Sequence, residues 1–175
     1  LNSLRNQIYS YFEFDAAEVE DVNISRLIMK MVDLAEQRST LRNINLSRVA
    51  EENIYIRIVP DAFEKAVMGL IKNAIENTPD GGDVQVSLAK ENGNIVVEVK
   101  DTGIGITTES RQQIFGGFYY AQDTDLYATK KPFDFGAGGK ALDLLRIKIF
   151  GEIYDFQVDC ETTRCGYIPL ETDLC

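Results

Sequence analysis

The sequence contains no histidine and no tryptophan, and its three cysteines all lie close to the end. The absence of an imidazole excludes a Ser-His-Asp triad and a histidine metal site. An odd number of cysteines fits a reducing compartment better than a secreted disulfide framework, so we expect a cytoplasmic location. Cys160 and Cys165 could hold a metal or react, but reduced thiols on the last strands are the simpler interpretation.

The sequence also lacks long apolar runs and an excess of positive charge. No stretch of about 18 apolar residues is present, so we expect no membrane-spanning helix. A net charge of −10 argues against binding to duplex DNA, other nucleic acids or anionic membranes. With 45% apolar residues, 175 residues suit one globular domain with its own core. Because no basic and apolar leader follows Leu1, we expect no signal peptide and a piece of a longer protein, which can itself be anchored in a membrane.

Hydrophobic periodicity predicts an alternation of helices and strands. Apolar spacing predicts helices over residues 1–18, 26–42, 62–78, 107–115 and 139–150. Alternation predicts strands over residues 54–59, 84–88, 95–99, 153–160 and 166–170. Ser25 and Asp61 are candidate N-caps, and acidic residues 13–21 suggest a linker. We expect an α+β fold, a two-layer sandwich in which helices cover one face of one mixed sheet. The long loop at 116–136 is of a kind that is usually functional.

The predicted helix 62–78 carries a polar face beside its apolar stripe. Gly69, Asn73, Glu76 and Asn77 follow at helical spacing and therefore share one side. A small residue followed by polar ones makes room for a ligand, and an asparagine oxygen suits Mg²⁺, which also takes phosphate oxygens and water. A solvated polar face explains the same pattern.

A second signal follows the apolar strand that ends at Asp101. A carboxylate fixed there can accept a hydrogen bond from an exocyclic amine, such as that of adenine. Gly103 and Gly105 permit close approach of the backbone to a ring or a phosphate, and Ile106 closes the motif. An ordinary turn at the end of a strand is the alternative.

A third signal is the run from Gly136 to Lys140, which leads into an apolar helix. Successive N–H groups at a helix start can bind an anion. Cations outnumber anions from residue 128 to residue 150, which suits a triphosphate; they are Lys130, Lys131, Lys140, Arg146 and Lys148. A flexible glycine hinge is the alternative. Between the second and third signals lie aromatic residues that could anchor a lid or pack into the core: Phe115, Phe118, Tyr119 and Tyr120.

The order and spacing of these signals resemble the ATP-binding domain of sensor histidine kinases. The matching motifs are Asn73-Ala-Ile-x-x-Thr-Pro-x-Gly-Gly82, Asp101-x-Gly-x-Gly-Ile106, Ile114-Phe-x-x-Phe118 and the glycines at 136–139, spread over about residues 19–170. The resemblance implies the Bergerat α/β sandwich with an ATP lid at 116–137, and ATP and Mg²⁺ as cofactors. It implies Asn73 as the Mg²⁺ ligand. The implied nucleotide-binding residues are Asn73, Glu76, Asn77, Asp101, Gly103, Gly105, Ile106, Phe118, Tyr119, Lys130, Lys131, Gly136, Gly138, Gly139, Lys140, Ala141 and Leu142.

The resemblance also implies a domain organisation and partners. Residues 1–18 resemble the end of a dimerisation helix with its linker, and residues 19–175 resemble the catalytic domain. The phosphoacceptor histidine of such kinases lies in the dimerisation domain, which this chain lacks. The implied partners are that dimerisation and histidine phosphotransfer domain and the receiver domain of a response regulator, with a homodimeric full-length protein.

Three departures from the family pattern bear on activity. Gly69 stands where the kinases often carry a polar residue and the ATPase branches a glutamate base, so we expect no water-activating ATPase. Glu76 stands where the family usually has lysine or arginine near the phosphates. The last glycine of the glycine run is displaced or replaced by Lys140, which we expect to supply the missing phosphate charge. A degenerate module that binds nucleotide or a partner without phosphotransfer is the alternative function.

Overall fold

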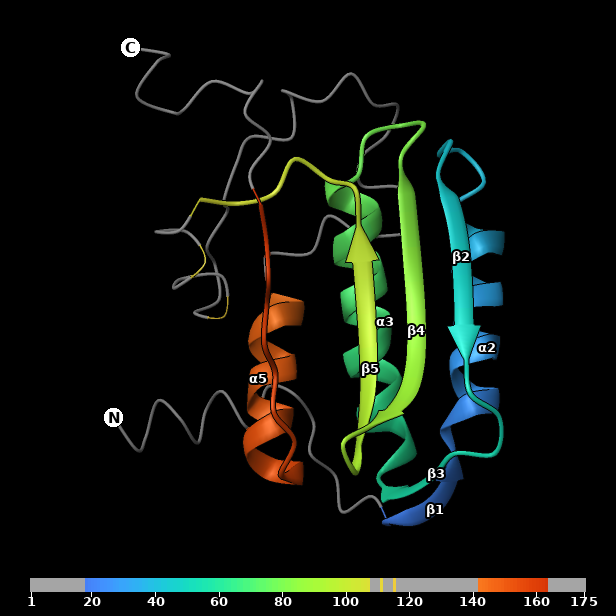
Figure 1. Cartoon of the computed structure of the whole chain (residues 1–175), viewed down its shortest axis with the longest axis vertical. Coiled ribbons are helices and arrows are strands. Elements are labelled where there is room, and N and C mark those ends of the chain that lie inside the picture. The colour runs from blue at the N-terminus through green and yellow to red at the C-terminus, as the bar shows by residue number, and fades with distance from the viewer. Residues whose placement is uncertain (1–17, 108–110, 112–114, 116–141, 164–175) are drawn as a thin grey trace.

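The computed structural model describes residues 18–107, 111, 115 and 142–163 (Figure 1). Its elements are β1 (Glu20–Asn23), α2 (Ile24–Arg38), β2 (Asn45–Ala50), β3 (Tyr55–Ile58), α3 (Pro60–Asn77), β4 (Asp83–Glu91), β5 (Asn94–Asp101) and α5 (Leu142–Tyr154). The helix predicted before residue 18, the lid and the strand predicted at 166–170 lie outside the described residues. None of the described helices is long and apolar enough to cross a membrane.

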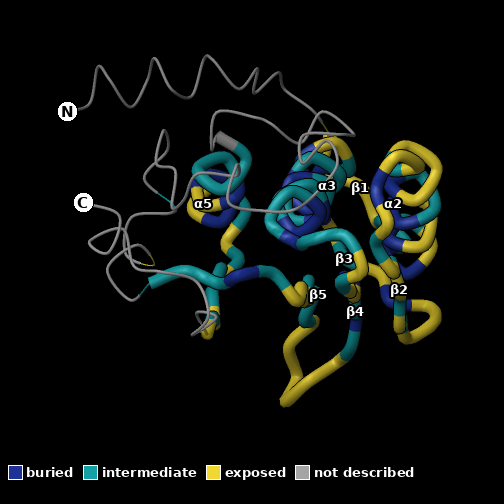
Figure 2. The backbone as a smooth tube through the Cα atoms, turned by 90° about the horizontal axis from the view of Figure 1, so that it is seen from above, coloured by how far each residue is buried: buried dark blue, intermediate teal, exposed yellow. Residues whose placement is uncertain are grey.

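The strands form one mixed sheet and one small antiparallel pair. β4 is the middle strand of the first sheet, parallel to β2 and antiparallel to β5. β1 and β3 pair separately. Figure 2 shows α5, α3 and α2 in a row on one side of the three-stranded sheet. This arrangement confirms the predicted α+β sandwich with helices on one face of a mixed sheet, although the described strands divide into two sheets rather than one.

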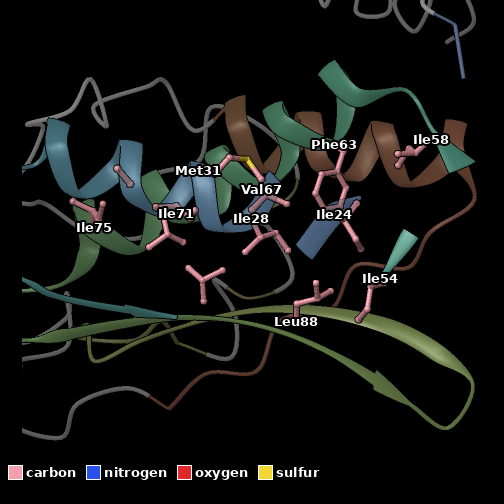
Figure 3. Packing of buried hydrophobic residues seen from close by; sticks show 13 residues of the cluster. Ile24, Ile28, Met31, Ile54, Ile58, Phe63, Val67, Ile71, Ile75 and Leu88 are labelled. Carbon is pink, nitrogen blue, oxygen red and sulfur yellow. The ribbon is translucent and has the colours of Figure 1, made fainter. Parts of the chain in front are cut away.

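The core lies between the central strand and the helices α2 and α3. Alternate residues of β4, from Val84 through Val86 to Leu88, are buried on the helical side. α3 faces them with Val67, Ile71 and Ile75. Figure 3 shows this cluster between the helices and the sheet. The other large side chains of the cluster that the figure labels on α2, on α3 and near β3 are Ile24, Ile28, Met31, Ile54, Ile58 and Phe63. Each such side chain contributes about 1.5 to 3 kcal/mol by leaving water.

α5 packs on α3 through a second apolar cluster. Ala62 and Ala66 of α3 meet Ile147 and Phe150 of α5 there, together with Val59. The small alanines let the two helices come close. α3 is therefore fixed between the sheet, α2 and α5, and its position determines that of every polar residue along it.

The N-terminal part differs from the sequence predictions in its strands and in the two ends of its helix. β1 and β2 were not predicted, and Glu20 and Asp21 belong to a strand rather than to a linker. The N-cap of α2 is Asn23, whose side-chain oxygen accepts from the N–H of Arg26 at 3.0 Å. Ser25 is instead buried one residue inside the helix, and α2 ends at Arg38, before the predicted 42. Short polar strands give weak alternation, which is why the periodicity missed them.

Two later predictions also need correction. Asp61 lies in the first turn of α3 and pairs with Lys65 at 2.8 Å, while Val59 occupies the N-cap position without a side-chain hydrogen bond. No strand forms at 153–160: α5 continues to Tyr154, and residues 155–160 follow without regular secondary structure. The chain then reverses: the N–H of Phe156 donates to the carbonyl of Gly151 at 3.1 Å, which holds residue 156 against the helix end. The hairpin of β4 and β5 is confirmed.

Ser25 supports a prediction about stability. Its hydroxyl donates to the carbonyl of Glu51 at 2.6 Å and accepts from the N–H of Ile54 at 3.0 Å. Ser25→Ala leaves the fully buried Ile54 without this partner, so we expect the free energy of unfolding to fall by about 1 to 3 kcal/mol in urea denaturation.

The control is Ser47→Ala on β2, where the hydroxyl reaches the carbonyl of Val84 only at 3.5 Å. This change should cost at most about 0.5 kcal/mol. Equal losses in the two variants would contradict the bridging role of Ser25.

Candidate functional site

The C-terminal half of α3 presents the first group of predicted site residues. Asn73, Glu76 and Asn77 are all half-buried there. The Nδ2 group of Asn77 donates to the carbonyl of Asn73 at 2.8 Å and to its Oδ1 at 3.3 Å. An amide oxygen has two lone pairs, so Oδ1 of Asn73 can accept this bond and still bind a cation. Asn77 thus orients Asn73.

The second group lies in the turn that follows β5. The N–H of Gly103 donates to Oδ1 of Asp101 at 2.9 Å, which fixes one carboxylate oxygen. A Cβ added at Gly103 would lie 2.5 Å from the carbonyl oxygen of Asn77 and 2.6 Å from Oδ1 of Asp101. Only glycine fits between these atoms. The turn carrying Asp101 is therefore packed directly on the last turn of α3, and contacts lead from Asp101 through Gly103 and Asn77 to Asn73.

The neighbouring loops hold this junction in place. Thr102 and Asp83 exchange hydrogen bonds: Thr102 N–H donates to the Asp83 carbonyl at 3.0 Å, and Asp83 N–H donates to the Thr102 hydroxyl at 2.8 Å. Gly105 has a φ of 68°, a conformation that favours glycine. The N–H of Ile106 donates to the hydroxyl of Thr162 at 3.2 Å, and the side chain of Ile104 is buried. The residues predicted at 101–106 therefore form one fixed turn.

Partial burial changes the electrostatics of Asp101. Removal of water from around the carboxyl raises its pKa above the ordinary value, and the hydrogen bond from Gly103 opposes that rise. The same hydrogen bond stabilises the carboxylate form. Asp101 is thus a fixed acceptor at the edge of the sheet.

Gly69 is buried, which corrects the expectation that it opens space for a ligand on a polar face. A Cβ there would lie 3.1 Å from Cβ of Asp143 and 3.6 Å from Cδ1 of Ile147. α5 fills the space that a side chain at 69 would need. Asp143 is itself paired with Arg146 at 2.8 Å. Gly69 therefore sets the spacing of α3 and α5 one helical turn before Asn73.

Glu76 is the most perturbed acid of the site. Burial and the negative charge of Asp143 raise its pKa to about 7, and the positive charge of Arg42 works in the opposite direction. The carboxyl groups of Asp143 and of Glu76, three residues after Asn73, thus lie close enough to interact, and that of Glu76 is partly protonated at neutral pH. Sequence reasoning missed Asp143 and Arg42, because an acid in a predicted apolar helix and an arginine at the end of another give no distinct signal.

Several predicted residues cannot be placed. Leu142 begins α5, and the remaining ones lie outside the described residues: Phe118, Tyr119, Lys130, Lys131, Gly136, Gly138, Gly139, Lys140 and Ala141. Within the described part of the chain, no group of three or more acids and cysteines could hold a metal. Asn73 alone is nevertheless compatible with Mg²⁺, which takes few protein ligands where phosphates and water supply the rest.

Comparison with known proteins agrees with this fold. Residues 58–146 match the family of histidine kinase-, DNA gyrase B-, and HSP90-like ATPases. The chain belongs to this family and is an ATP-binding domain of it. The matched range includes α3, the Asp101 turn and the start of α5. The resemblance inferred from the motifs is thereby confirmed.

The individual relatives are sensor kinases. The chain is 31% identical over 117 residues to the sensor-like histidine kinase SenX3 of Mycolicibacterium smegmatis, covering 60% of this chain and 28% of that protein. It therefore spans about a quarter of the length of this relative. Full-length ShkA in complex with AMPPNP has a TM-score of 0.62 at 20% identity, covering 79% of this chain and 27% of that one. Histidine kinase ThkA in complex with response regulator protein TrrA has a TM-score of 0.58 at 22% identity, covering 68% and 36%. These two structures show the same fold.

The raised pKa of Glu76 predicts a pH dependence of stability. Between its unperturbed value of 4.5 and about 7, the folded state binds the proton more tightly than the unfolded state. The native chain therefore loses stability as the pH rises through this window, and Glu76→Gln does not. Urea denaturation should show the variant gaining about 1 kcal/mol on the native chain from pH 5 to pH 8, since part of the group is solvent-screened.

Asp143→Asn is the companion variant, because it removes the neighbouring charge that raises the pKa of Glu76. It should reduce the pH dependence in part. A difference between Glu76→Gln and the native chain that stays constant from pH 5 to pH 8 would show that Glu76 is not perturbed in this way.

Proposed function

We propose that the chain binds Mg-ATP and donates the γ-phosphate to a histidine in a dimerisation domain that lies outside it, as part of a sensor histidine kinase. The observation that carries this proposal is the packing of the Asp101 turn on the end of α3, one helical turn beyond Asn73. Family membership and the names of the relatives support it. The domain would extend over residues 19–175.

The adenine end of the site would consist of Asp101 and the turn that follows it. The free oxygen of Asp101 would accept a hydrogen bond from the 6-amino group of adenine, which guanine cannot supply at that position. Gly103 and Gly105 would let the backbone approach the ring. Binding of AMPPNP by ShkA, a protein of the same fold, supports an adenine nucleotide as the ligand.

The phosphate end would begin at Asn73, whose Oδ1 would bind Mg²⁺. The ion would neutralise phosphate charge and orient the triphosphate. Phosphoryl transfer asks the protein mainly for positioning and charge neutralisation. Because Glu76 and Asp143 add negative charge here, a cation from the glycine-rich segment is needed, and we assign this part to Lys140. The nucleophile would come from the partner domain.

The proposed partners follow from the same assignment. The chain's own dimerisation and histidine phosphotransfer domain would receive the phosphoryl group, and the receiver domain of a response regulator would take it next. The complex of ThkA with TrrA, a kinase of the same fold with its regulator, supports this sequence of partners. The full-length protein would be a homodimer, with this domain in the cytoplasm.

A module that binds nucleotide without transferring phosphate is the second candidate. The acidic pair of Glu76 and Asp143 favours it, since two carboxyl groups near the triphosphate oppose its binding. The two functions differ in phosphotransfer by the full-length protein. Incubation with γ-labelled ATP should label a histidine in the kinase and none in the regulatory module.

Binding by the chain itself tests the site. Asp101→Asn should weaken Mg-ATP and adenosine alike by about 10-fold or more in titration calorimetry, because the amide offers the adenine amino group a poorer acceptor. Lys140→Ala should weaken Mg-ATP and leave adenosine unchanged. Glu98→Gln, on the exposed side of the same strand β5, is the control and should change neither.

Two outcomes would contradict the proposal. Failure of the native chain to bind Mg-ATP would exclude both candidate functions and favour a protein-interaction module. Equal losses of ATP and adenosine affinity in Lys140→Ala would refute the assigned phosphate contact.

A further inference from the structure

Arg42 is a buried cation at the end of the helix that carries the site. It lies in the loop between α2 and β2, and its side chain is 0% exposed. Its Nη1 donates to the carbonyl of Ile75 at 3.0 Å, its Nη2 to the carbonyl of Thr78 at 2.6 Å, and its Nε to Oδ1 of Asp80 at 3.1 Å. The last carbonyls of a helix lack partners within the helix, and here a distant residue supplies them.

The same contacts join two loops that are far apart in the sequence. Oδ1 of Asp80 also accepts from the N–H of Asn43 at 3.3 Å, and Gly81 N–H donates to the carbonyl of Asn43 at 2.6 Å. Figure 1 shows the start of β2, the end of α3 and the end of β5 at one edge of the molecule. The loop that precedes β2 therefore packs against the end of α3 and supports it.

The contacts of Arg42 with the end of α3 act on the candidate nucleotide site through Asn77. The two carbonyls that Arg42 holds, those of Ile75 and Thr78, lie on either side of Asn77 in the sequence. The carbonyl of Asn77 is the atom on which Gly103 packs, and Gly103 in turn fixes the carboxylate of Asp101. A shift of the last turn of α3 would therefore move the acceptor proposed for adenine.

We propose that Arg42 is a positioning residue for nucleotide binding, which holds the last turn of α3 against the Asp101–Gly103 turn. The proposal rests on the proposed function, because it assigns adenine to Asp101. Arg42 would not contact the nucleotide. It sets the distance between the acceptor for the base and Asn73, which would hold the metal at the triphosphate.

The geometry explains why arginine suits this place better than lysine. A guanidinium group presents five donors in a rigid plane and here reaches three acceptors in three directions. A lysine has one compact ammonium group on a flexible stem and can serve only part of this set. Arg42→Lys should therefore give a partial loss, and Arg42→Gln a fuller one.

The experiment must separate positioning from stability. Ile58→Ala serves as the control, because Ile58 lies in the core beyond the opposite end of α3, as Figure 3 shows. Ile58→Ala should destabilise the chain strongly without touching the junction of Asn77 and Gly103. All variants are compared at a temperature at which circular dichroism shows each of them folded.

Two readouts decide the question. Titration calorimetry with adenosine should show a loss of about 10-fold in Arg42→Gln, a smaller loss in Arg42→Lys and less than about 2-fold in Ile58→Ala. The amide signal of Gly103 in nitrogen–proton NMR spectra, recorded without nucleotide, should shift in both Arg42 variants and stay in place in Ile58→Ala.

The proposal is overturned if either readout in the Arg42 variants matches that of Ile58→Ala. If Arg42→Gln does not fold, Arg42→Lys carries the same comparison. Failure of the native chain to bind adenosine would overturn the proposed function instead, and the Gly103 signal would still decide whether Arg42 holds this turn.

Discussion

The contact between Gly103 and the carbonyl of Asn77 determines the arrangement of the whole candidate site. It joins the end of the sheet strand β5 to the end of helix α3, and it leaves no room for a side chain. An acid at the end of a strand and an amide on a helix are common features of proteins. They become a candidate nucleotide site here because close packing and one hydrogen bond hold them in a fixed relation.

Charges of both signs lie near this contact. Arg42 compensates the negative end of α3, whereas Glu76 and Asp143 add negative charge near the place proposed for the triphosphate. Burial is the larger cause of the rise in the pKa of Glu76 to about 7, and the negative charge of Asp143 adds to it. These two acids make the phosphate end the part of the site that most depends on cations, and the cations that we propose for it are Mg²⁺ and Lys140.

Strong periodicity and glycine-rich motifs made much of the fold predictable. The β4–β5 hairpin and the apolar stripe of α3 were predicted because buried residues recur at regular spacing. The short strands β1 and β2 were missed, because their alternation is weak and their pairing is nonlocal. Asp101 and Asn73 were predicted from their motifs, and the structure brings the end of α3 and the turn after Asp101 together. Gly69 was misread, since only the packing of α5 shows why that position must be small.

The most direct test of the central claim is the affinity of Gly103→Ala for Mg-ATP, measured by calorimetry on a variant shown to be folded. The added methyl group would lie 2.5 Å from the carbonyl oxygen of Asn77, so the turn or the helix end must move. We expect the affinity to fall by at least about 10-fold, which is roughly 1.4 kcal/mol. An affinity equal to that of the native chain would show that the junction of α3 and β5 does not form the nucleotide site.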